Sequence, residues 1–405
     1  MDAIDRTPRA MPKKRLMTPG PTPVPEATLQ ELAQPIFHHR TAEFRRMFSQ
    51  VLGDLRYVFQ TSWSPIVLTS SGTGAMEAAV VNSLAPGEQA LVLDAGRFAH
   101  RWAEICQTYG VEVIALDVPW GQAVDPEAVA ELLEKHPKVE AVLGTLSETS
   151  TGVDHDVEAI GRVVAETEAL LVVDGISGVG ATPCRTEAWG IDLLVVGSQK
   201  ALMLPPGLAF LSVSPKAWRK IEGTETRSFY FNLLKARAKL DVPDTPFTPA
   251  HTLIRALGAS LAQIRAEGIE AVWQRTGTLG RACRAGVQAM GLDVFAARPA
   301  AGVTAVTIPA ELDAEVVRKR LLERFGVTIA GGQQQLKGKI VRIAHMGYLD
   351  ALDLVGVLAA MELVLDELGH AVELGAAVAA AQRVLAEDKP GATVATHKHA
   401  AAPSS

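Results

Sequence analysis

The chain has 405 residues, of which 48% are apolar and 21% charged, and its formal net charge is −6. That composition is globular and excludes disorder over the whole chain. The mild acidity also disfavours a protein that binds nucleic acid by neutralising phosphates, because such proteins are usually basic. At about 150 residues per domain, the length predicts roughly two or three domains.

The cysteines give a second exclusion. Cys106, Cys184 and Cys283 lie far apart and form no CxxC pair. This spacing argues against a disulfide framework, a structural zinc site and an iron–sulfur site, and it fits a reducing compartment. No window of 18 apolar residues occurs, and the basic N-terminus is not followed by an apolar stretch. We expect a cytoplasmic protein without a membrane span or a metal.

Both ends of the chain differ in composition from the rest. Residues 1–24 are predicted to form an arm that ends in the proline-rich turn TPGPTPVP (18–25). Such a turn cannot be a regular helix or a central strand. The alanine-rich end passes into polar and small residues, so residues 386–405 are predicted to be a disordered tail.

Short apolar runs recur between residues 66 and 214. They are continuous rather than alternating in hydrophobicity, which is typical of strands buried on both faces. Helical patterns at 74–84, 126–136 and 156–168 lie between them, and this predicts a mostly parallel sheet covered by helices on both sides. The predicted strands are IVLTSSG (66–72), ALVLDAG (90–96), EVIALDV (112–118), VEAVLGTL (139–146), LLVVDGIS (170–177), DLLVVGSQ (192–199) and LAFLSVS (208–214).

The last two runs are joined by QKALMLPPG, which is too short for a helical crossover. The run at 208–214 is therefore predicted to pair antiparallel. From about residue 250 the pattern changes to one or two long helices, followed by short strands interleaved with helices. We predict a large domain over residues 25–255 and a smaller α+β domain over residues 256–385.

Ligands of open α/β sheets bind at the carboxyl ends of the strands, so the residues after each run are the first candidates for a site. Ser70-Ser71-Gly72-Thr73-Gly74 follows the first run and precedes a helix. Small residues, hydroxyls and a helix N-terminus suit a phosphate, although the same residues also fit an N-cap after a tight turn. The segment matches neither GxxxxGK[ST] nor GxGxxG.

Two charged residues also follow strands. Asp174 comes after LLVV and fits a metal ligand, a cofactor partner or a helix cap. Lys200 comes after the run at 192–199 and fits either a snorkelling lysine or a desolvated amine that forms a Schiff base with a carbonyl. With the phosphate cradle, these are the groups that pyridoxal 5′-phosphate requires for its aldehyde, ring nitrogen and phosphate. Phe98 is placed either to stack on the ring or to join the core.

The sequence resembles the class V aminotransferases of pyridoxal-phosphate fold type I, near the serine–glyoxylate and alanine–glyoxylate (serine–pyruvate) aminotransferases. The resemblance covers about residues 16–370. It implies an α/β fold with a seven-stranded, mostly parallel sheet, a smaller α+β C-terminal domain and pyridoxal 5′-phosphate as cofactor. The matching stretches are LMTPGPTPVP, SSGTGAMEAAVVNSLAPG, ETSTGV, LLVVDGISGVGATP, GIDLLVVGSQKALMLPPGLAFLSVS and VRIAHMG.

The resemblance implies a role for each matching residue. Lys200 in GSQK is the implied Schiff-base lysine, and Asp174 in VVDGIS is the implied partner of the pyridinium nitrogen. Arg342 in VRIAHMG is implied to bind the α-carboxylate of the substrate, a planar target that suits a guanidinium. The other implied cofactor contacts are Ser71, Gly72 and Thr73 at the phosphate, Gln199 beside it, Phe98 and Ile176 against the ring, Thr149 near the ring hydroxyl, and Thr248.

The family is dimeric, so the resemblance also implies a homodimer. Thr248 matches a threonine that reaches the phosphate of the neighbouring subunit, whereas Thr245 stands where some relatives have a tyrosine. The cross-subunit contact is therefore only partly supported. His38-His39-Arg40 lies where relatives line the mouth of the site near the dimer interface, and it fits either a substrate contact or interface structure.

The implied reaction is transamination of serine or alanine with glyoxylate or another small 2-keto acid. Ureidoglycine, aspartate and aminoethylphosphonate stay open as amino donors, because small pockets differ by only a few side chains. A cysteine desulfurase needs a mobile cysteine, which GGQQQLKG before VRIAH does not contain. A non-catalytic partner-binding subunit, such as a soluble hydrogenase small subunit, is the alternative from another class, and the presence of Lys200, Asp174 and Arg342 argues against it.

Overall fold

A computed structural model of the chain describes residues 13–387. The first twelve residues of the predicted arm, and residues 388–405 of the predicted tail, lie outside the described residues. Within the described range, none of the helices combines the length and the apolar character needed to cross a bilayer.

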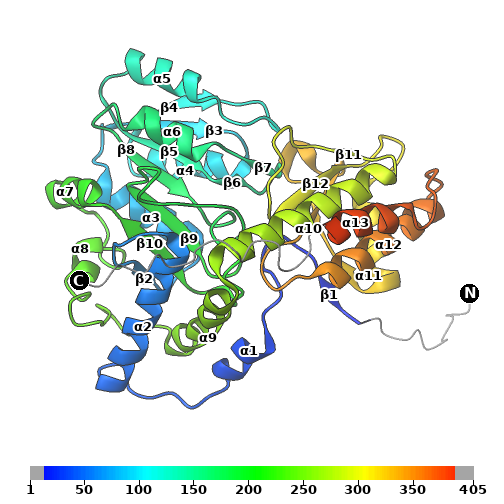
Figure 1. Ribbon diagram of the computed structural model, residues 1–405. Coiled ribbons are helices and arrows are strands. Elements are labelled where there is room, and N and C mark those ends of the chain that lie inside the picture. Colours follow the sequence, from blue (N-terminus) through cyan, green and yellow to red (C-terminus); the bar gives the residue numbers. More distant parts are fainter. Residues whose placement is uncertain (1–12, 388–405) are drawn as a thin grey trace, which may run out of the picture.

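A seven-stranded sheet forms the centre of the larger part of the molecule (Figure 1). β10 pairs antiparallel with both β9 and β2, and the pairs from β9 to β4 are all parallel. This confirms the predicted strands, the mostly parallel sheet and the antiparallel run at 208–214. The order is β2 (Ile66–Leu68), β10 (Ala209–Val213), β9 (Leu193–Gly197), β8 (Leu170–Asp174), β5 (Val139–Thr145), β3 (Gln89–Asp94) and β4 (Glu112–Asp117).

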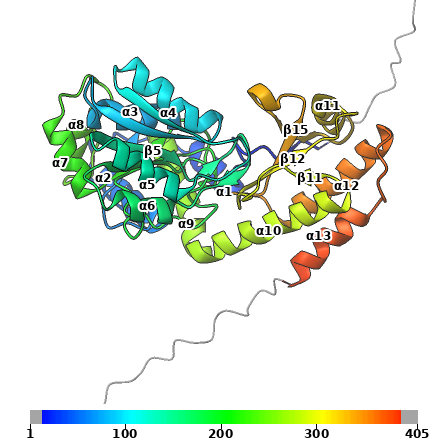
Figure 2. The ribbon, with the colours of Figure 1, turned by 90° about the horizontal axis from the view of Figure 1, so that it is seen from above.

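Helices cover both faces of this sheet (Figure 2). One face carries α2 (Ala42–Phe59), α5 (Pro126–Lys135), α6 (Val157–Val164) and α9 (His251–Glu267). The other carries α3 (Gly72–Ser83), α4 (Arg97–Thr108), α7 (Pro215–Gly223) and α8 (Leu233–Arg237). The short α1 (Glu26–Leu32) precedes them, and a two-stranded ribbon of β6 (Ser147–Glu148) and β7 (Val153–Asp154) follows β5.

The continuous apolar runs arise because alternate side chains of a strand enter two different cores. In β8, Leu171 and Val173 belong to the core that includes α2 and α9, whereas Leu170 and Val172 belong to the core that includes α3 and α4. All four side chains are 2% exposed or less. Full burial of such a side chain contributes about 1.5–3 kcal/mol, so each face of the sheet is stabilised by its own layer of helices.

A second sheet, antiparallel and four-stranded, forms the smaller part. Its order is β11 (Asp293–Val294), β12 (Val303–Thr307), β15 (Ile340–Ala344) and β14 (Ala330–Gly331). It shares a separate core with α10 (Ile269–Ala289), α11 (Ala314–Phe325), α12 (Ala351–Glu367) and α13 (Ala376–Glu387). A short 3₁₀ turn, η1 (Gln334–Leu336), lies between β14 and β15. The fold is therefore the predicted α/β type, and α13 includes residues 386 and 387, where the predicted tail begins.

The long helical pattern after residue 250 is two helices. α9 ends and α10 begins at Gly268, whose φ of 88° lies in the left-handed region that glycine adopts without strain. Ile269 and Trp273 of α10 pack in a core of the large sheet, whereas Leu279 and Val287 pack in the core of the smaller part. One helix therefore spans both parts of the molecule (Figure 2).

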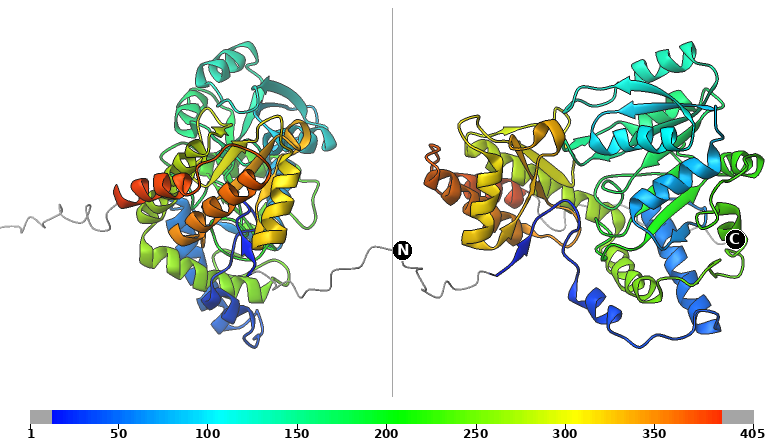
Figure 3. Two further views of the ribbon diagram at one scale, coloured as in Figure 1. Left: turned by 90° about the vertical axis from the view of Figure 1, so that its right-hand side faces the viewer. Right: turned by 180° about the vertical axis from the view of Figure 1, so that it is seen from behind.

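Part of the predicted arm joins the smaller part instead of standing free. β1 (Arg15–Leu16) pairs parallel with β13 (Val327–Thr328), and the Ala344 N–H donates to the Met17 carbonyl at 2.9 Å. The turn that follows is neither helix nor strand, as predicted, and leads to α1 beside the large sheet (Figure 3). The N-terminal segment thereby crosses from one part to the other.

Candidate active site

A cavity of about 390 Å³ lies where the carboxyl edge of the large sheet, the smaller part and the N-terminal segment meet. It brings together Phe98, Thr149 and Lys200, which follow strands of the large sheet, with Arg342 of β15 and Arg318 of α11. Its volume lies in the range of about 300–1,000 Å³ typical of small-molecule sites. The other lining residues are Thr18, Pro19, Gly20, Thr328, Ile329, Ala330, Gly331, Gly332 and Gln333.

The Lys200 amine is held by backbone rather than by an acid. Its Nζ donates to the Pro19 carbonyl at 2.5 Å, and the Thr22 hydroxyl donates to the Lys200 carbonyl at 2.8 Å. A Cβ on Gly20 would lie 2.2 Å from Nζ, so the N-terminal segment can approach this closely only through glycine. Burial lowers the pKa of Lys200 from 10.5 to about 8, although the nearby Asp174 carboxylate opposes the shift. A larger fraction of this amine than of an ordinary lysine is therefore unprotonated near neutral pH, as a nucleophile or base requires.

Asp174, the last residue of β8, is a buried acid without an ion-pair partner among residues 13–387. It is 5% exposed, and its Oδ1 accepts a hydrogen bond from the Ile176 N–H at 2.8 Å. Burial raises the pKa of Asp174 from 3.8 to about 7, because one backbone donor does not compensate the lost hydration. A cation bound at this carboxylate, such as a protonated ring nitrogen, would offset that cost.

The predicted phosphate cradle is the N-terminus of α3. Ser71 is its N-cap, but the Ser71 side chain accepts no capping hydrogen bond. A Cβ on Gly72 would lie 2.4 Å from Cδ1 of Ile176, so glycine is what lets Ile176 pack against this turn. Gln199 lies beside them, and its Oε1 is buried without a hydrogen-bond partner in residues 13–387. Free N–H groups at a helix start, next to a polar side chain with spare capacity, suit an anion.

Arg342 is a buried cation bound only to carbonyl groups. It is 5% exposed, its Nη1 donates to the Thr149 carbonyl at 2.8 Å, and its Nε and Nη2 donate to the Gly331 carbonyl at 3.0 and 2.8 Å. Burial lowers the pKa of Arg342 to about 10. A guanidinium that faces a cavity and has no acid partner among the described residues suits a carboxylate ligand.

Comparison with known families decides the assignment. The family model for Aminotransferase class-V matches residues 18–349. The chain belongs to the class V aminotransferases. These enzymes depend on pyridoxal phosphate, and the buried acid, the lysine of lowered pKa and the glycine-containing helix start fit that cofactor.

Relatives of this aminotransferase carry different names. A "Soluble hydrogenase, small subunit" of Synechococcus sp. (strain PCC 6716) is 42% identical, covering 92% of this chain and 98% of the relative. An L-aspartate–glyoxylate aminotransferase of Paracoccus denitrificans is 38% identical, covering 91% of this chain and 95% of the relative. A serine–glyoxylate aminotransferase of Methylorubrum extorquens is 34% identical, covering 93% of this chain and 97% of the relative. A crystal structure of ureidoglycine–glyoxylate aminotransferase from Bacillus subtilis matches with a TM-score of 0.88 at 30% identity, covering 94% and 100% of the two chains.

Sequence reasoning gave no role to Glu148, the acid of ETSTG that ends β6. Its fully buried carboxylate accepts from the Phe98 and Ala99 N–H groups at 3.1 and 2.9 Å, and from the N–H and hydroxyl of Ser150 at 2.9 and 2.6 Å. It therefore holds the start of α4, and with it Phe98, at the cavity wall. A negative charge at a helix N-terminus is favourable, yet burial still raises the pKa of Glu148. The only sequence signal was an acid directly after a strand.

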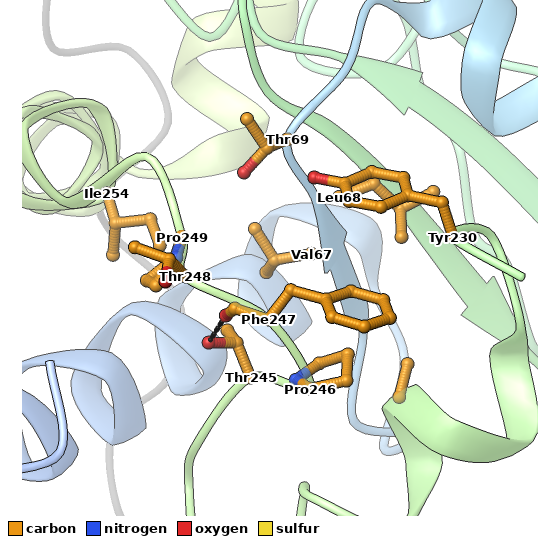
Figure 4. Close-up of a pocket in the computed structure, with 11 residues that line it drawn as sticks. Val67, Leu68, Thr69, Tyr230, Thr245, Pro246, Phe247, Thr248, Pro249 and Ile254 are labelled. Atoms are coloured by element: carbon orange, nitrogen blue, oxygen red, sulfur yellow. Dashed lines mark hydrogen bonds between the residues drawn. The ribbon is translucent and has the colours of Figure 1, made fainter.

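Of the predicted site residues, Phe98, Thr149, Lys200 and Arg342 line the cavity, whereas Asp174, Ile176, Gln199 and the cradle residues do not. Thr248 also lies outside it. It is exposed and lines a separate pocket of about 30 Å³ with Thr69, Tyr230 and Phe247 (Figure 4). Thr69 directly precedes the cradle, and its hydroxyl accepts from the Ala250 N–H at 3.2 Å. The loop of Thr248 thus packs behind the cradle of its own chain, and its contact with a neighbouring subunit's phosphate stays a prediction.

The His38-His39-Arg40 segment is fixed to the same loop. Arg40 pairs with Asp244 at 2.5 Å and donates to the Thr245 carbonyl at 2.7 Å. Neither histidine lines the cavity around Lys200. Within one chain, this segment therefore supports the loop before Thr248, and its predicted place at the mouth of a site depends on a second subunit.

The cysteines offer no nucleophile near the cavity. All three are buried free thiols. Burial raises the pKa of Cys106 and of Cys184 to about 12, and that of Cys283 to about 11, so the reactive thiolate is disfavoured at neutral pH. Within the described range, no three His, Cys, Asp or Glu side chains gather as a metal site would require.

We predict that Asp174→Asn stabilises the cofactor-free protein more at pH 8 than at pH 5. Because burial raises the pKa of Asp174 from 3.8 to about 7, the folded protein keeps a proton between these values that the unfolded chain has released. The wild type therefore loses stability as pH rises through this window, and the loss is complete above it. Thermal unfolding of both proteins at the two pH values measures the gain, and equal gains would contradict the prediction.

We predict that Glu148→Gln weakens pyridoxal phosphate binding roughly threefold to tenfold. The variant loosens Phe98, whose stacking on a ring is worth about 0.5–1.5 kcal/mol. Glu362→Gln is the matched control, because Glu362 is also buried and accepts from the Gly375 and Ala377 N–H groups at the start of α13. Both variants should unfold at lower temperature, but only Glu148→Gln should raise the dissociation constant. If the dissociation constant of pyridoxal phosphate were the same in both variants, the role of Glu148 would be purely structural and the prediction would be wrong.

Proposed function

We propose that this protein transaminates a small amino acid, serine or alanine, with glyoxylate or another small 2-keto acid, through pyridoxal phosphate bound covalently to Lys200. The observation that carries the proposal is the placement of Lys200 and Arg342 on one cavity. The amine can react with the aldehyde of the cofactor, and the guanidinium can hold the carboxylate of a substrate in the same cavity. The glyoxylate named in several of the matched proteins supports the acceptor.

Each residue has one task in this proposal. The bound cofactor would supply an electron sink that weakens the bond between the substrate's α-carbon and its proton. With the cofactor bound, the Lys200 amine would take up that proton and give it back, and a pKa of about 8 suits a group that both accepts and donates a proton. Arg342 fixes the carboxylate so that the α-proton faces Lys200. Asp174 keeps a negative charge at the ring nitrogen, and Phe98 stacks on the ring.

Three further groups hold the cofactor without moving a proton. We assign the phosphate to the N-terminus of α3, at Ser71, Gly72 and Thr73, with Gln199 beside it. Ile176 packs on Gly72, and we assign its side chain to a contact with the cofactor ring. The Thr149 hydroxyl donates to the Ser177 hydroxyl, which leaves its lone pairs for the ring hydroxyl.

Aspartate is the second candidate donor, and Arg318 is the observation that favours it. Arg318 lines the cavity and would offer a cation to a second carboxylate. However, its Nη1 already pairs with Glu315 at 2.5 Å, and its Nε donates to the Ile329 carbonyl at 3.1 Å. Glu315 already offsets the charge of Arg318, so this arginine attracts a second carboxylate less than an unpaired one would, which favours serine or alanine as the donor.

A non-catalytic subunit is the alternative that the hydrogenase-named relative brings forward. Such a role needs no buried charges in a cavity. The chain nevertheless keeps Asp174 and Arg342 buried, and Lys200 half-buried, without ion-pair partners in residues 13–387, at a cost in stability that a ligand would offset. Catalysis explains this arrangement and partner binding does not.

We further propose that the protein is a cytoplasmic homodimer. Phe229 and Tyr230 are 74% and 44% exposed, and the Tyr230 ring stacks on Phe247 with ring centres 5.2 Å apart (Figure 4). Exposed aromatic clusters of this kind mark protein interfaces. The cluster adjoins Thr248, so a second copy seated there would lie beside the residue for which a cross-subunit role is predicted. Three free thiols fit a reducing compartment.

We predict that Lys200→Ala lowers turnover by at least about 10²–10⁴-fold, the usual contribution of a proton-transferring group. The wild type should show an absorbance band of bound cofactor that changes on addition of L-serine or L-alanine and is restored by glyoxylate. L-aspartate, tested in parallel, should react more slowly. Lys216→Ala is the control, because Lys216 also binds a backbone carbonyl, that of Ala169 at 2.7 Å, but outside the cavity. Normal turnover by Lys200→Ala would end the proposal.

We predict that sites form across a dimer. Lys200→Ala and Thr248→Glu should each be inactive, the second because a carboxylate would repel the neighbouring phosphate. Co-expressed with different tags and purified as mixed dimers, they should regain activity, since one site per dimer then has both native residues. Lys200→Ala paired with itself is the control. Mixed dimers without activity, or a fully active monomer on sizing, would contradict the cross-subunit role.

A further inference from the structure

Arg101, in the second turn of α4, carries a charge beside the phosphate cradle that no assignment above uses. Its Nη1 donates to the Thr73 hydroxyl at 3.1 Å, and its guanidinium carbon lies 5.1 Å from the centre of the Phe98 ring. Thr73 belongs to the cradle and Phe98 to the cavity wall. Arg101 therefore connects the predicted phosphate site to the predicted ring site.

The charge of Arg101 is not neutralised by an acid. Arg97, one turn earlier in α4, pairs with Glu104 at 2.9 Å, whereas Arg101 makes no ion pair within residues 13–387. Its charge reaches the site, because it contributes to lowering the pKa of both Asp174 and Lys200. A half-buried cation without an anionic partner, hydrogen-bonded to an anion cradle, indicates a ligand of negative charge.

The cradle needs such a charge. A phosphate monoester carries about −1.5 to −2 charges near pH 7, whereas a helix N-terminus supplies only about +0.5. The hydroxyls of Ser71 and Thr73 are neutral, and Lys200 is engaged at the aldehyde in the function proposed above. Arginine has five N–H donors, so one bond to Thr73 leaves the others free for phosphate oxygens.

We propose that Arg101 is a phosphate-binding residue, which supplies the full positive charge of the cradle and orients the Thr73 hydroxyl toward the phosphate. The proposal rests on the proposed function only for the identity of the ligand, a phosphate monoester on a pyridine aldehyde. This assignment adds a residue of α4 to the phosphate site, which within one chain is otherwise built from α3 and from the loop after β9.

The test compares two ligands that differ only in the phosphate. Dissociation constants of pyridoxal phosphate and of pyridoxal are measured by absorbance with the wild-type chain, Arg101→Gln and the control Arg97→Gln. Arg101→Gln should raise the dissociation constant of pyridoxal phosphate about 10- to 100-fold, which is the effect of losing one charge-assisted hydrogen bond. The dissociation constant of pyridoxal should change by no more than about threefold. Arg97→Gln should change neither constant. Inorganic phosphate should compete with pyridoxal phosphate for the wild type and less for Arg101→Gln.

A second variant guards against misfolding. Arg101→Lys keeps the charge and should retain most of the affinity for pyridoxal phosphate. An equal loss of affinity for both ligands would place Arg101 behind Phe98 and overturn its phosphate role, and so would unchanged constants for both. A wild type that binds neither ligand would instead overturn the proposed function together with this inference. A Lys200→Ala enzyme that keeps its turnover, with the Arg101 effect intact, would overturn transamination alone.

Discussion

The structure depends on holding three ionisable side chains, two of them buried and one half-buried, without giving them ion-pair partners. Lys200, Asp174 and Arg342 form no ion pair in the part of the chain that the structure describes, and each is held instead by backbone groups. Burial of an unpaired charge costs stability unless a ligand supplies the opposite charge. The two-sided cores of the large sheet, with their fully buried strands, provide the stability that makes this arrangement possible.

Topology explains how three distant positions meet. The parallel strands β8 and β9 end at the same edge of the large sheet, so Asp174 and Lys200 follow neighbouring strands. The other walls come from elsewhere in the chain: β15 brings Arg342, and the N-terminal segment lays the Pro19 carbonyl on the Lys200 amine. Neither part of the molecule contains the site alone. The helix α10 and the strand β1, which join the two parts, are therefore structural elements of the site.

The sequence was sufficient for the sheet and for two of the charges, because continuous apolar runs followed by a charged residue are a local pattern. The role of Arg342 could be predicted only from the family resemblance, because a basic residue within an apolar strand fits several different roles. Glu148 and Arg101 gave no usable signal, and the predicted turn at Pro19–Gly20 gave no sign of its contact with Lys200. Their contacts join residues 50, 28 and 181 positions apart, and no local pattern encodes such pairs. The predicted partner contact of Thr248 depends on a second chain and so lies beyond what one chain can show.

The central claim is that Lys200 carries the cofactor. Reduction of the purified, cofactor-loaded protein with borohydride, followed by digestion and mass spectrometry, measures it directly, because reduction makes the bond to the lysine permanent. The account predicts a phosphopyridoxyl mass on the peptide that contains Lys200 and on no other. An adduct on a different lysine, or none in a protein that binds the cofactor, would contradict it.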